Sequence, residues 1–237
     1  MKQNQHTIAY SRIIHLSHII DIDIPQWPGD PPVEFTTAAN IPQHGYYLRR
    51  FSLGEHSATH INAPNSFHDD GEGIDQYSAD SLVLPGVVID ICEAAVNADY
   101  TLTIADILAW EKKHGEIAVG SLVLLHTGWQ NKWLDKNAFF NFDAEGIMHF
   151  PGFGCDVTQF LLEERQIAGL GIDTHGVDPG ENNSFIVNRL VLAQQRIVLE
   201  NLTNLQELPA KGTTLMIGVL RLRDGSGSPV GVLALVP

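Results

Sequence analysis

The sequence has 237 residues, 44% of them hydrophobic, which is enough to bury one sizeable core, so we expect a single domain over residues 1–237. Its 28 Asp and Glu residues against 14 Lys and Arg give a net charge of -14, which repels nucleic acid and anionic membranes, and we expect neither as a partner. Only two cysteines, no apolar run of the ~20 residues that span a bilayer, and a polar start over Met1–Tyr10 predict a reduced, cytoplasmic protein.

The segment from Tyr46 to Asn62 has no helical period, and we expect it to be extended. In one continuous strand, residues of one parity would share a face, among them Arg50, His56, His60 and Asn62. We expect the chemistry of the protein on that face.

Two imidazoles lie four residues apart in this segment, at His56 and His60, and a third follows at His68. Pro64 and the turn-prone composition favour an extended chain with a bend, which could aim both of the first two rings at one ion. Imidazole favours zinc, manganese or similar metals. The alternative is that both rings satisfy buried hydrogen bonds near a turn, and the spacing alone does not choose between the two.

Four later segments are short, apolar and partly β-branched, which is typical of strands buried on both faces. They are residues 87–91, 121–125, 168–172 and 196–199. Helical segments with recognisable caps lie between these runs, and the expected helices begin at Thr103, at Asp156 and near Asn183 or Ser184. The alternation predicts the α/β class, with a mixed sheet or barrel-like β core and flanking helices.

Short motifs along the chain resemble those of the putative cyclase family, which includes kynurenine formamidases and isatin hydrolases. The family signature reads His-x-Gly-Thr-His-x-Asp-x-Pro-x-His-Phe, and the matching positions are His56, Thr59, His60, Pro64 and Phe67. Further landmarks in the family's order are Trp27-Pro28-Gly29-Asp30, Thr127-Gly128-Trp129, Gly171-Ile172-Asp173-Thr174, Val177-Asp178, Glu200-Asn201-Leu202 and Gly227-Ser228-Pro229. The resemblance covers nearly the whole chain and implies the family's swivelling β/β/α fold.

The resemblance also implies metal ligands, and some of them are substituted. His56, His60 and Glu200 stand at expected ligand positions, whereas Asn62 replaces a bridging Asp and Asn188 replaces a downstream His. An Asn oxygen carries no negative charge, so it cannot hold two dications together against their repulsion. We therefore expect one divalent ion, zinc or manganese, with ligands drawn from His56, His60, Asn62 and Glu200, and a metal-free site stays the alternative.

The last His of the signature is implied in proton transfer, and Ser66 stands in its place. A serine nucleophile would need an adjacent base and an oxyanion hole, which the sequence does not display. We expect His68 to move the proton instead, since it shares a strand face with Ser66 if the chain stays extended. The following Asp69-Asp70-Gly71 predicts a turn, however, and an exposed loop histidine is the alternative.

Aromatic and imidazole side chains are expected to contact the substrate. Trp27 and Phe67, with Trp129, could form an aromatic wall for a planar molecule, although each could equally belong to the core. His175 follows an apolar strand and enters a turn-rich loop, a common position for such contacts.

The resemblance implies a function: hydrolysis of a carbon–nitrogen bond in a small amide, arylformamide or lactam, by a metal-activated water. It also implies a homodimer or homotetramer. The alternative is a degenerate, metal-free relative that binds a small metabolite, because Asn62, Ser66 and Asn188 replace three functional positions.

Overall fold

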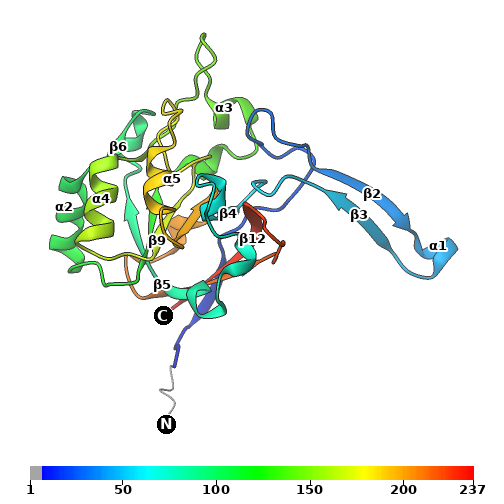
Figure 1. The fold of residues 1–237 in the computed structure, drawn as a ribbon, viewed down its shortest axis with the longest axis horizontal. Helices are drawn as coiled ribbons and strands as arrows, with labels where there is room; N and C mark the ends of the chain where they lie inside the picture. Colours follow the sequence, from blue (N-terminus) through cyan, green and yellow to red (C-terminus); the bar gives the residue numbers. More distant parts are fainter. Residues whose placement is uncertain (1–6) are drawn as a thin grey trace.

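A closed, mixed β-sheet forms the centre of the structure, a computed structural model that describes residues 7–237 (Figure 1). Hydrogen-bonded neighbours follow the order β12, β11, β5, β7, β9, β10 and β4, and β4 pairs in turn with β12 to close the ring. β1 pairs with the end of β12. The strands are β1 (Arg12–His15), β4 (His60–Asn62), β5 (Val83–Asp90), β7 (Leu122–His126), β9 (Gly169–Ile172), β10 (Ile197–Glu200), β11 (Thr213–Val219) and β12 (Gly227–Val236).

The four strands expected from apolar runs, β5, β7, β9 and β10, form the parallel part of this sheet. Alternate residues of β7 show why its sequence is continuously apolar. Leu122 and Leu124 face the core enclosed by the sheet, whereas Val123 and Leu125 face a second core beneath the helices, and all four are fully buried. The predicted α/β class, with a barrel-like β core and flanking helices, is confirmed.

Three helices cover the outer face of the parallel strands: α2 (Ile104–His114), α4 (Cys155–Glu163) and α5 (Ile186–Val191) (Figure 1). The predicted start of α2 is confirmed, because Thr103 and Asp106 form a reciprocal capping box. By contrast, α4 begins without a side-chain cap, and Asp156 lies within its first turn. Other short elements of the body are α3 (Lys136–Phe140), β6 (Thr101–Leu102) and β8 (Gly152–Phe153).

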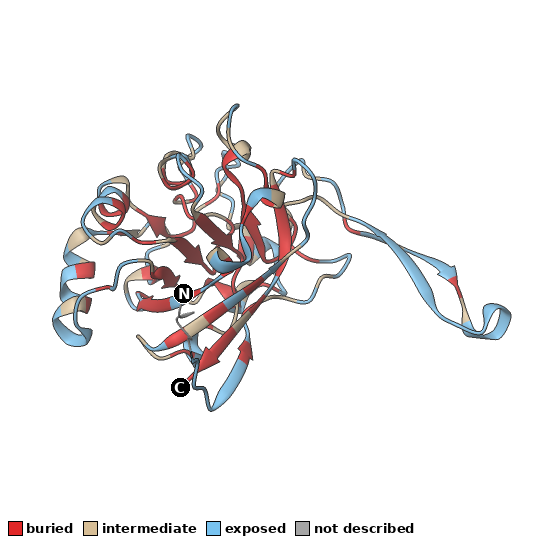
Figure 2. Ribbon diagram, turned by 60° about the horizontal axis from the view of Figure 1, so that its bottom comes forward, coloured by how far each residue is buried: buried red, intermediate tan, exposed pale blue. Residues whose placement is uncertain are grey.

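A two-stranded hairpin projects from the body of the protein (Figures 1 and 2). It consists of β2 (Glu34–Ala39), α1 (Ile41–His44) and β3 (Leu48–Ser52). The expectation of one strand face from Tyr46 to Asn62 is wrong, because β3 pairs only with β2 while β4 is buried in the central sheet. The chain turns between them, and Ala58, which replaces the signature Gly, adopts a left-handed conformation with φ 54°.

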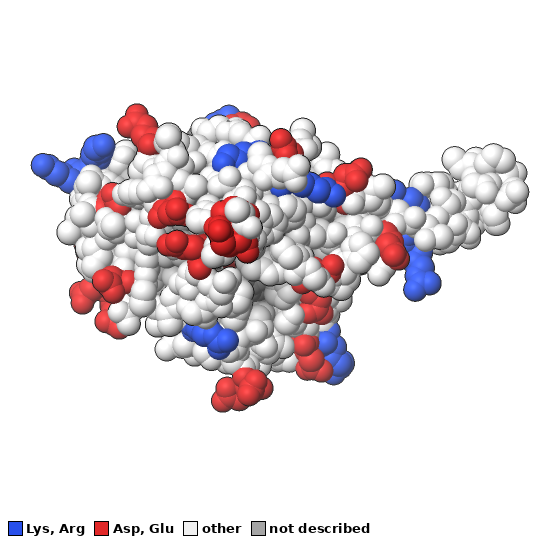
Figure 3. All heavy atoms as spheres, turned by 90° about the horizontal axis from the view of Figure 1, so that it is seen from above, with Lys and Arg blue, Asp and Glu red and all other residues white. Residues whose placement is uncertain are grey.

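The surface reflects the acidic composition, with acidic side chains outnumbering basic ones on the face seen in Figure 3. The tip of the hairpin carries neither kind of charge there. None of the described helices combines the length and the apolar character that crossing a bilayer requires.

Candidate active site

A cavity of about 300 Å³ is lined by His56 and His60, and we call it the histidine pocket. Its lining has an aromatic part and a polar part. The aromatic residues are Trp27, Phe67, Phe150 and Phe185, and the polar residues include His56, His60, Asn62, Asn188 and Glu200. Since β4, α5 and β10 supply most of the polar group, segments distant in the sequence meet here.

His60 and Glu200 form a buried pair at this pocket. His60 Nδ1 donates a hydrogen bond to the carbonyl of Ala58 at 2.9 Å, which directs Nε2 toward Glu200 Oε2 at 3.0 Å. Burial alone would raise the pKa of Glu200, but hydrogen bonds from His60, Asn188 and the Val177 amide outweigh it and lower that pKa to about 2. Glu200 is therefore a carboxylate, and either a proton or a metal cation can fill the space between the two groups.

The two asparagines at substituted ligand positions form a hydrogen-bonded chain. Asn188 Nδ2 donates to two carboxylates, Asp178 at 3.1 Å and Glu200 at 3.2 Å, which fixes the orientation of its amide. Its oxygen then accepts from Asn62 Nδ2 at 3.1 Å. Consequently Asn62 Oδ1 faces His56 Nδ1 at 2.8 Å and accepts a hydrogen bond from its N–H.

This chain sets the protonation of His56. Burial, followed by the nearby charge of His60, lowers the pKa of His56, so its ring is neutral at pH 7. The other ring nitrogen, Nε2, lies 2.9 Å from Ser226 Oγ, and the hydroxyl of Ser226 donates to Glu55 Oε2 at 2.7 Å. Glu55 holds Ser226 in place by accepting its backbone N–H at 2.7 Å.

The donors in the pocket suit one transition-metal ion, but they are arranged in two pairs. His60 Nε2 and Glu200 Oε2 face each other at a separation that two ligands of one ion can have, and this chemistry fits zinc or manganese. His56 instead faces Asn62. Among the described residues, one donor atom each from His56, His60 and Glu200 cannot be chosen so that all three lie within 4.8 Å of one another. All four expected ligands thus line one pocket, but only His60 and Glu200 face each other closely enough to bind one ion together.

The two residues expected to act in catalysis lie apart. Ser66 lines the pocket, but its hydroxyl donates to the carbonyl of Ser226. His68 lies outside the lining, and its Nε2 donates to the carbonyl of Arg189 at 3.0 Å. The expectation that His68 shares a face with Ser66 is wrong, because Pro64 begins a 3-10 turn that ends the extended chain.

The expected substrate-contact residues Trp27, Phe67 and His175 all line the pocket. The His175 ring stacks on Phe140, with ring centroids 5.5 Å apart. Burial, then the nearby charge of His60, lowers the pKa of His175 to about 4, so this imidazole is neutral. Its Nε2 is buried and has no hydrogen-bond partner among the described residues. Trp129, considered for the aromatic wall, does not line the pocket and is buried behind it, in the core cluster that also contains Phe150.

Sequence reasoning missed Phe150 and Phe185, which complete the aromatic part of the pocket. Phe150 precedes a Pro-Gly pair, and Phe185 directly precedes α5 with a left-handed backbone, φ 53°. Neither has a periodic or motif signal. An unusual aromatic residue in a loop rich in Gly and Asn was the available indication for Phe185.

This chain is similar to known hydrolases over most of its length. An isatin hydrolase of Roseibium aggregatum is 38% identical over 194 residues, covering 78% of this chain and 73% of that protein. A kynurenine formamidase of Bacillus anthracis is 26% identical over 221 residues, covering 93% and 95%. The solved structure of isatin hydrolase A from Ralstonia solanacearum has a TM-score of 0.90 at 31% identity, covering 95% and 92%.

The sequence profile of one family matches a continuous part of this chain. Its description is "Putative cyclase", and the match spans residues 14–179, more than half of the chain. The matched segment holds β4 with His60 and Asn62, while Glu200 and Asn188 follow it. This chain belongs to the putative cyclase family.

Proposed function

We propose that this chain hydrolyses the carbon–nitrogen bond of a small planar amide, a lactam or an arylformamide, in the histidine pocket. The observation that carries the proposal is the division of the pocket into an aromatic part and a buried polar part. The relatives named isatin hydrolase and kynurenine formamidase act on substrates of these two classes, and a similar isatin hydrolase structure, TM-score 0.88 at 32% identity, holds the product analogue thioisatinate.

The aromatic side chains would bind and orient a flat substrate. Trp27, Phe67 and Phe185 lie near one another, with ring centroids of Trp27 and Phe185 6.0 Å apart and of Phe67 and Phe185 5.7 Å apart. Aromatic side chains supply contact area and a preferred ring orientation together. Such contacts would hold the amide carbonyl against the polar part of the pocket.

The proposed nucleophile is a water activated by one divalent ion, zinc or manganese. His60 and Glu200 would hold the ion, with His56 and Asn62 beside them, and the bound ion would lower the pKa of a coordinated water. His175 replaces His68 as the residue proposed to move a proton, because its neutral ring lines the pocket and its Nε2 has no partner among the described residues.

One observation favours the second candidate, a metal-free member that binds a metabolite. The chain from Glu200 through Asn188 and Asn62 to His56 satisfies its polar groups with hydrogen bonds inside the protein. Such a network can persist without an ion. Metal chemistry and metal-free binding therefore make different predictions for the same residues.

Metal analysis and turnover separate the two candidates. We expect purified protein, supplied with zinc or manganese, to retain about one ion in the histidine pocket and to hydrolyse isatin, N-formylkynurenine or both. His60→Ala removes one proposed ligand and should lower both metal content and turnover. The matched control is His68→Ala, which should leave turnover unchanged. Protein that stays inert to both substrates after metal addition, yet binds isatin, would support the metabolite-binding candidate.

We also propose that the hairpin makes the chain a homodimer or homotetramer. Its exposed apolar side chains include Ile41, Tyr46, Tyr47, Leu48 and Phe51. An arm that extends away from the body of the protein (Figure 2), with exposed apolar side chains and an uncharged tip (Figure 3), is suited to burial against a second copy.

A further inference from the structure

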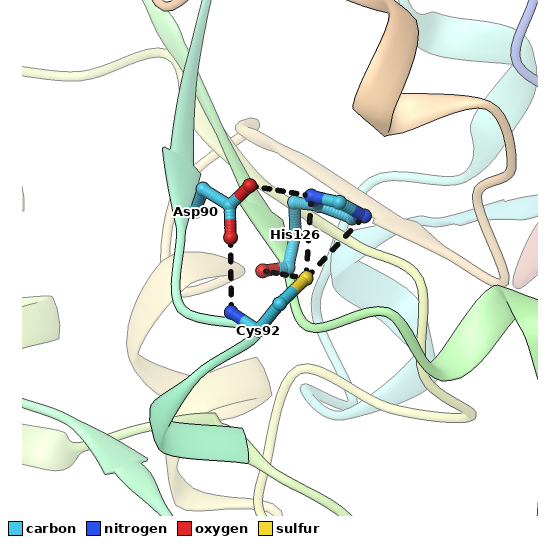
Figure 4. A group of neighbouring side chains, drawn as sticks. All are labelled: Asp90, Cys92 and His126. Carbon is cyan, nitrogen blue, oxygen red and sulfur yellow. Dashed lines mark hydrogen bonds and ion pairs between the residues drawn. The ribbon is translucent and has the colours of Figure 1, made fainter. Parts of the chain in front are cut away.

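A second group of metal-ligating side chains lies outside the histidine pocket (Figure 4). Asp90 ends β5 and His126 ends β7, and the two are register partners in this parallel pair. Cys92 follows Asp90 by two residues and turns back toward the same ring. The carboxyl ends of neighbouring parallel strands thus bring together a carboxylate, a thiol and an imidazole, and none of the three lines the histidine pocket.

The separations between these donors are close to those of ligands around one ion. His126 Nδ1 lies 3.1 Å from Asp90 Oδ2 and 3.5 Å from Cys92 Sγ, and all three donors lie within 4.8 Å of one another. Zinc bonds of about 2.0 Å to nitrogen, 2.3 Å to sulfur and 2.1 Å to oxygen place tetrahedral ligands roughly 3.3 to 3.6 Å apart. We propose that Asp90, Cys92 and His126 bind one divalent transition-metal ion of the zinc type, with a water as the fourth ligand.

Surrounding groups hold the donors in position. The backbone N–H of Cys92 donates to Asp90 Oδ1 at 2.9 Å, which leaves Oδ2 to face His126. Cys92 Sγ lies over the face of the imidazole, 3.5 and 3.6 Å from its two nitrogens, so binding requires it to move toward the ring plane. Gly128 gives it room, since a Cβ there would lie only 3.2 Å from the sulfur, and its φ of +79° disfavours other residues.

The open side of this group supplies space for the water ligand. Asp90 and His126 line a cavity of about 440 Å³, whose wall also includes Trp110 and Gln206. The side chain of Asp90 is 62% exposed, so an ion can reach it from solvent. On binding, the Cys92 thiol loses its proton to solvent and its thiolate bonds to the metal, leaving His126 neutral.

A cysteine nucleophile assisted by His126 is the competing interpretation. Proton transfer requires the sulfur to lie in line with one ring nitrogen, whereas Sγ is almost equally distant from both. Burial and the adjacent Asp90 carboxylate also raise the pKa of the Cys92 thiol to about 12. The free thiol is therefore poorly suited to nucleophilic attack at pH 7.

Cobalt(II) titration tests the site, because a thiolate bound to cobalt gives an intense near-ultraviolet charge-transfer band. Full-length protein, stripped with a chelator under reducing conditions, is titrated with cobalt alone. We expect a band that saturates by about two ions per chain in the wild-type protein, where the histidine pocket also takes up cobalt, and at about one ion per chain in His60→Ala protein. The band should disappear when excess zinc is added. The histidine pocket cannot produce this band, because neither Cys92 nor Cys155 lines it.

Matched variants assign the band to its residues. Cys92→Ser should abolish it, Cys155→Ser should preserve it, and His60→Ala should preserve it even if metal is lost from the histidine pocket. Asp90→Asn, at an exposed side chain, should weaken cobalt affinity by roughly 10-fold or more while circular dichroism stays unchanged. Absence of a band in the folded wild-type protein, or a band that survives Cys92→Ser, would overturn the proposal.

Discussion

Glu200 of β10 lies directly opposite His60 of β4 in the antiparallel ladder, with Glu200 Oε2 3.0 Å from His60 Nε2. Both side chains are buried, and Glu200 accepts two further hydrogen bonds, from Val177 and Asn188. A buried carboxylate is stable only with such partners, since removal from water costs several kcal/mol. The strand pairing and these hydrogen bonds therefore allow the charged Glu200 side chain to be buried at the pocket.

Glu200→Gln tests whether this charge is required. The amide keeps the size of the side chain and can still accept from the Val177 N–H, but it offers an ion no negative charge. We expect metal affinity and kcat/KM for isatin or N-formylkynurenine to fall by roughly 100-fold or more. Initial rates and metal titration measure both, with Glu207→Gln, an exposed glutamate, as the control. Undiminished turnover would remove Glu200 from the mechanism.

Asn62→Asp combined with Asn188→His tests why the pocket should hold a single ion. The double variant restores the donor types expected of two-metal family members, and a bridging carboxylate offsets the repulsion between two dications. We expect the metal content of the pocket to rise from one ion to two. The comparison is made in a Cys92→Ser background, so that the proposed sulfur site does not contribute. Asn97→Asp adds the same charge at an exposed loop and should leave the content unchanged.

The ion pair between Glu111 of α2 and Arg165, just after α4, predicts a dependence of stability on pH. Arg165 donates to both oxygens of Glu111, at 2.7 and 2.9 Å, and this bonding lowers the pKa of Glu111 below its ordinary 4.5. A lowered folded-state pKa stabilises the protein above 4.5, and the contribution is lost as pH falls through the folded-state value. Glu111→Gln should therefore lower the free energy of unfolding by about 1 kcal/mol near pH 7.

Urea unfolding at decreasing pH checks this sign. The difference in the free energy of unfolding between wild type and Glu111→Gln should narrow below pH 4.5, where Glu111 of the unfolded wild-type chain takes up a proton. Arg165→Gln and the double variant complete a cycle that isolates the pair from other effects of each substitution. A difference that stays constant over this range would show that the pair does not contribute through charge.

The hairpin predicts a loss of assembly when its apolar surface becomes charged. Leu48→Glu with Phe51→Glu places two carboxylates on exposed positions of β3, where they should not affect folding of the central sheet. We expect the molar mass from light scattering to fall to that of one chain, because burying unpaired charges at an interface is unfavourable. Val96→Glu, another exposed apolar position away from the hairpin, should leave the mass unchanged. A wild-type protein that is already monomeric would contradict the proposed role of the hairpin.

Some expectations from the sequence succeeded because their causes are local. The apolar runs identified β5, β7, β9 and β10, since a strand buried on both faces needs apolar residues at every position. The Thr103 cap likewise depends only on neighbouring residues. The error over Tyr46–Asn62 has the opposite origin: an extended pattern does not tell whether its two ends join the same sheet, and here β3 and β4 do not.

For this protein, residue chemistry along the chain determined four strands of the central sheet, the start of α2 and most of the side chains that could serve the site. Only the tertiary structure decided how these side chains pair. His60 meets Glu200, and Asp90 meets His126, through the register of strands that are distant in sequence. Register and strand order depend on the packing of the whole closed sheet, and no local pattern records them.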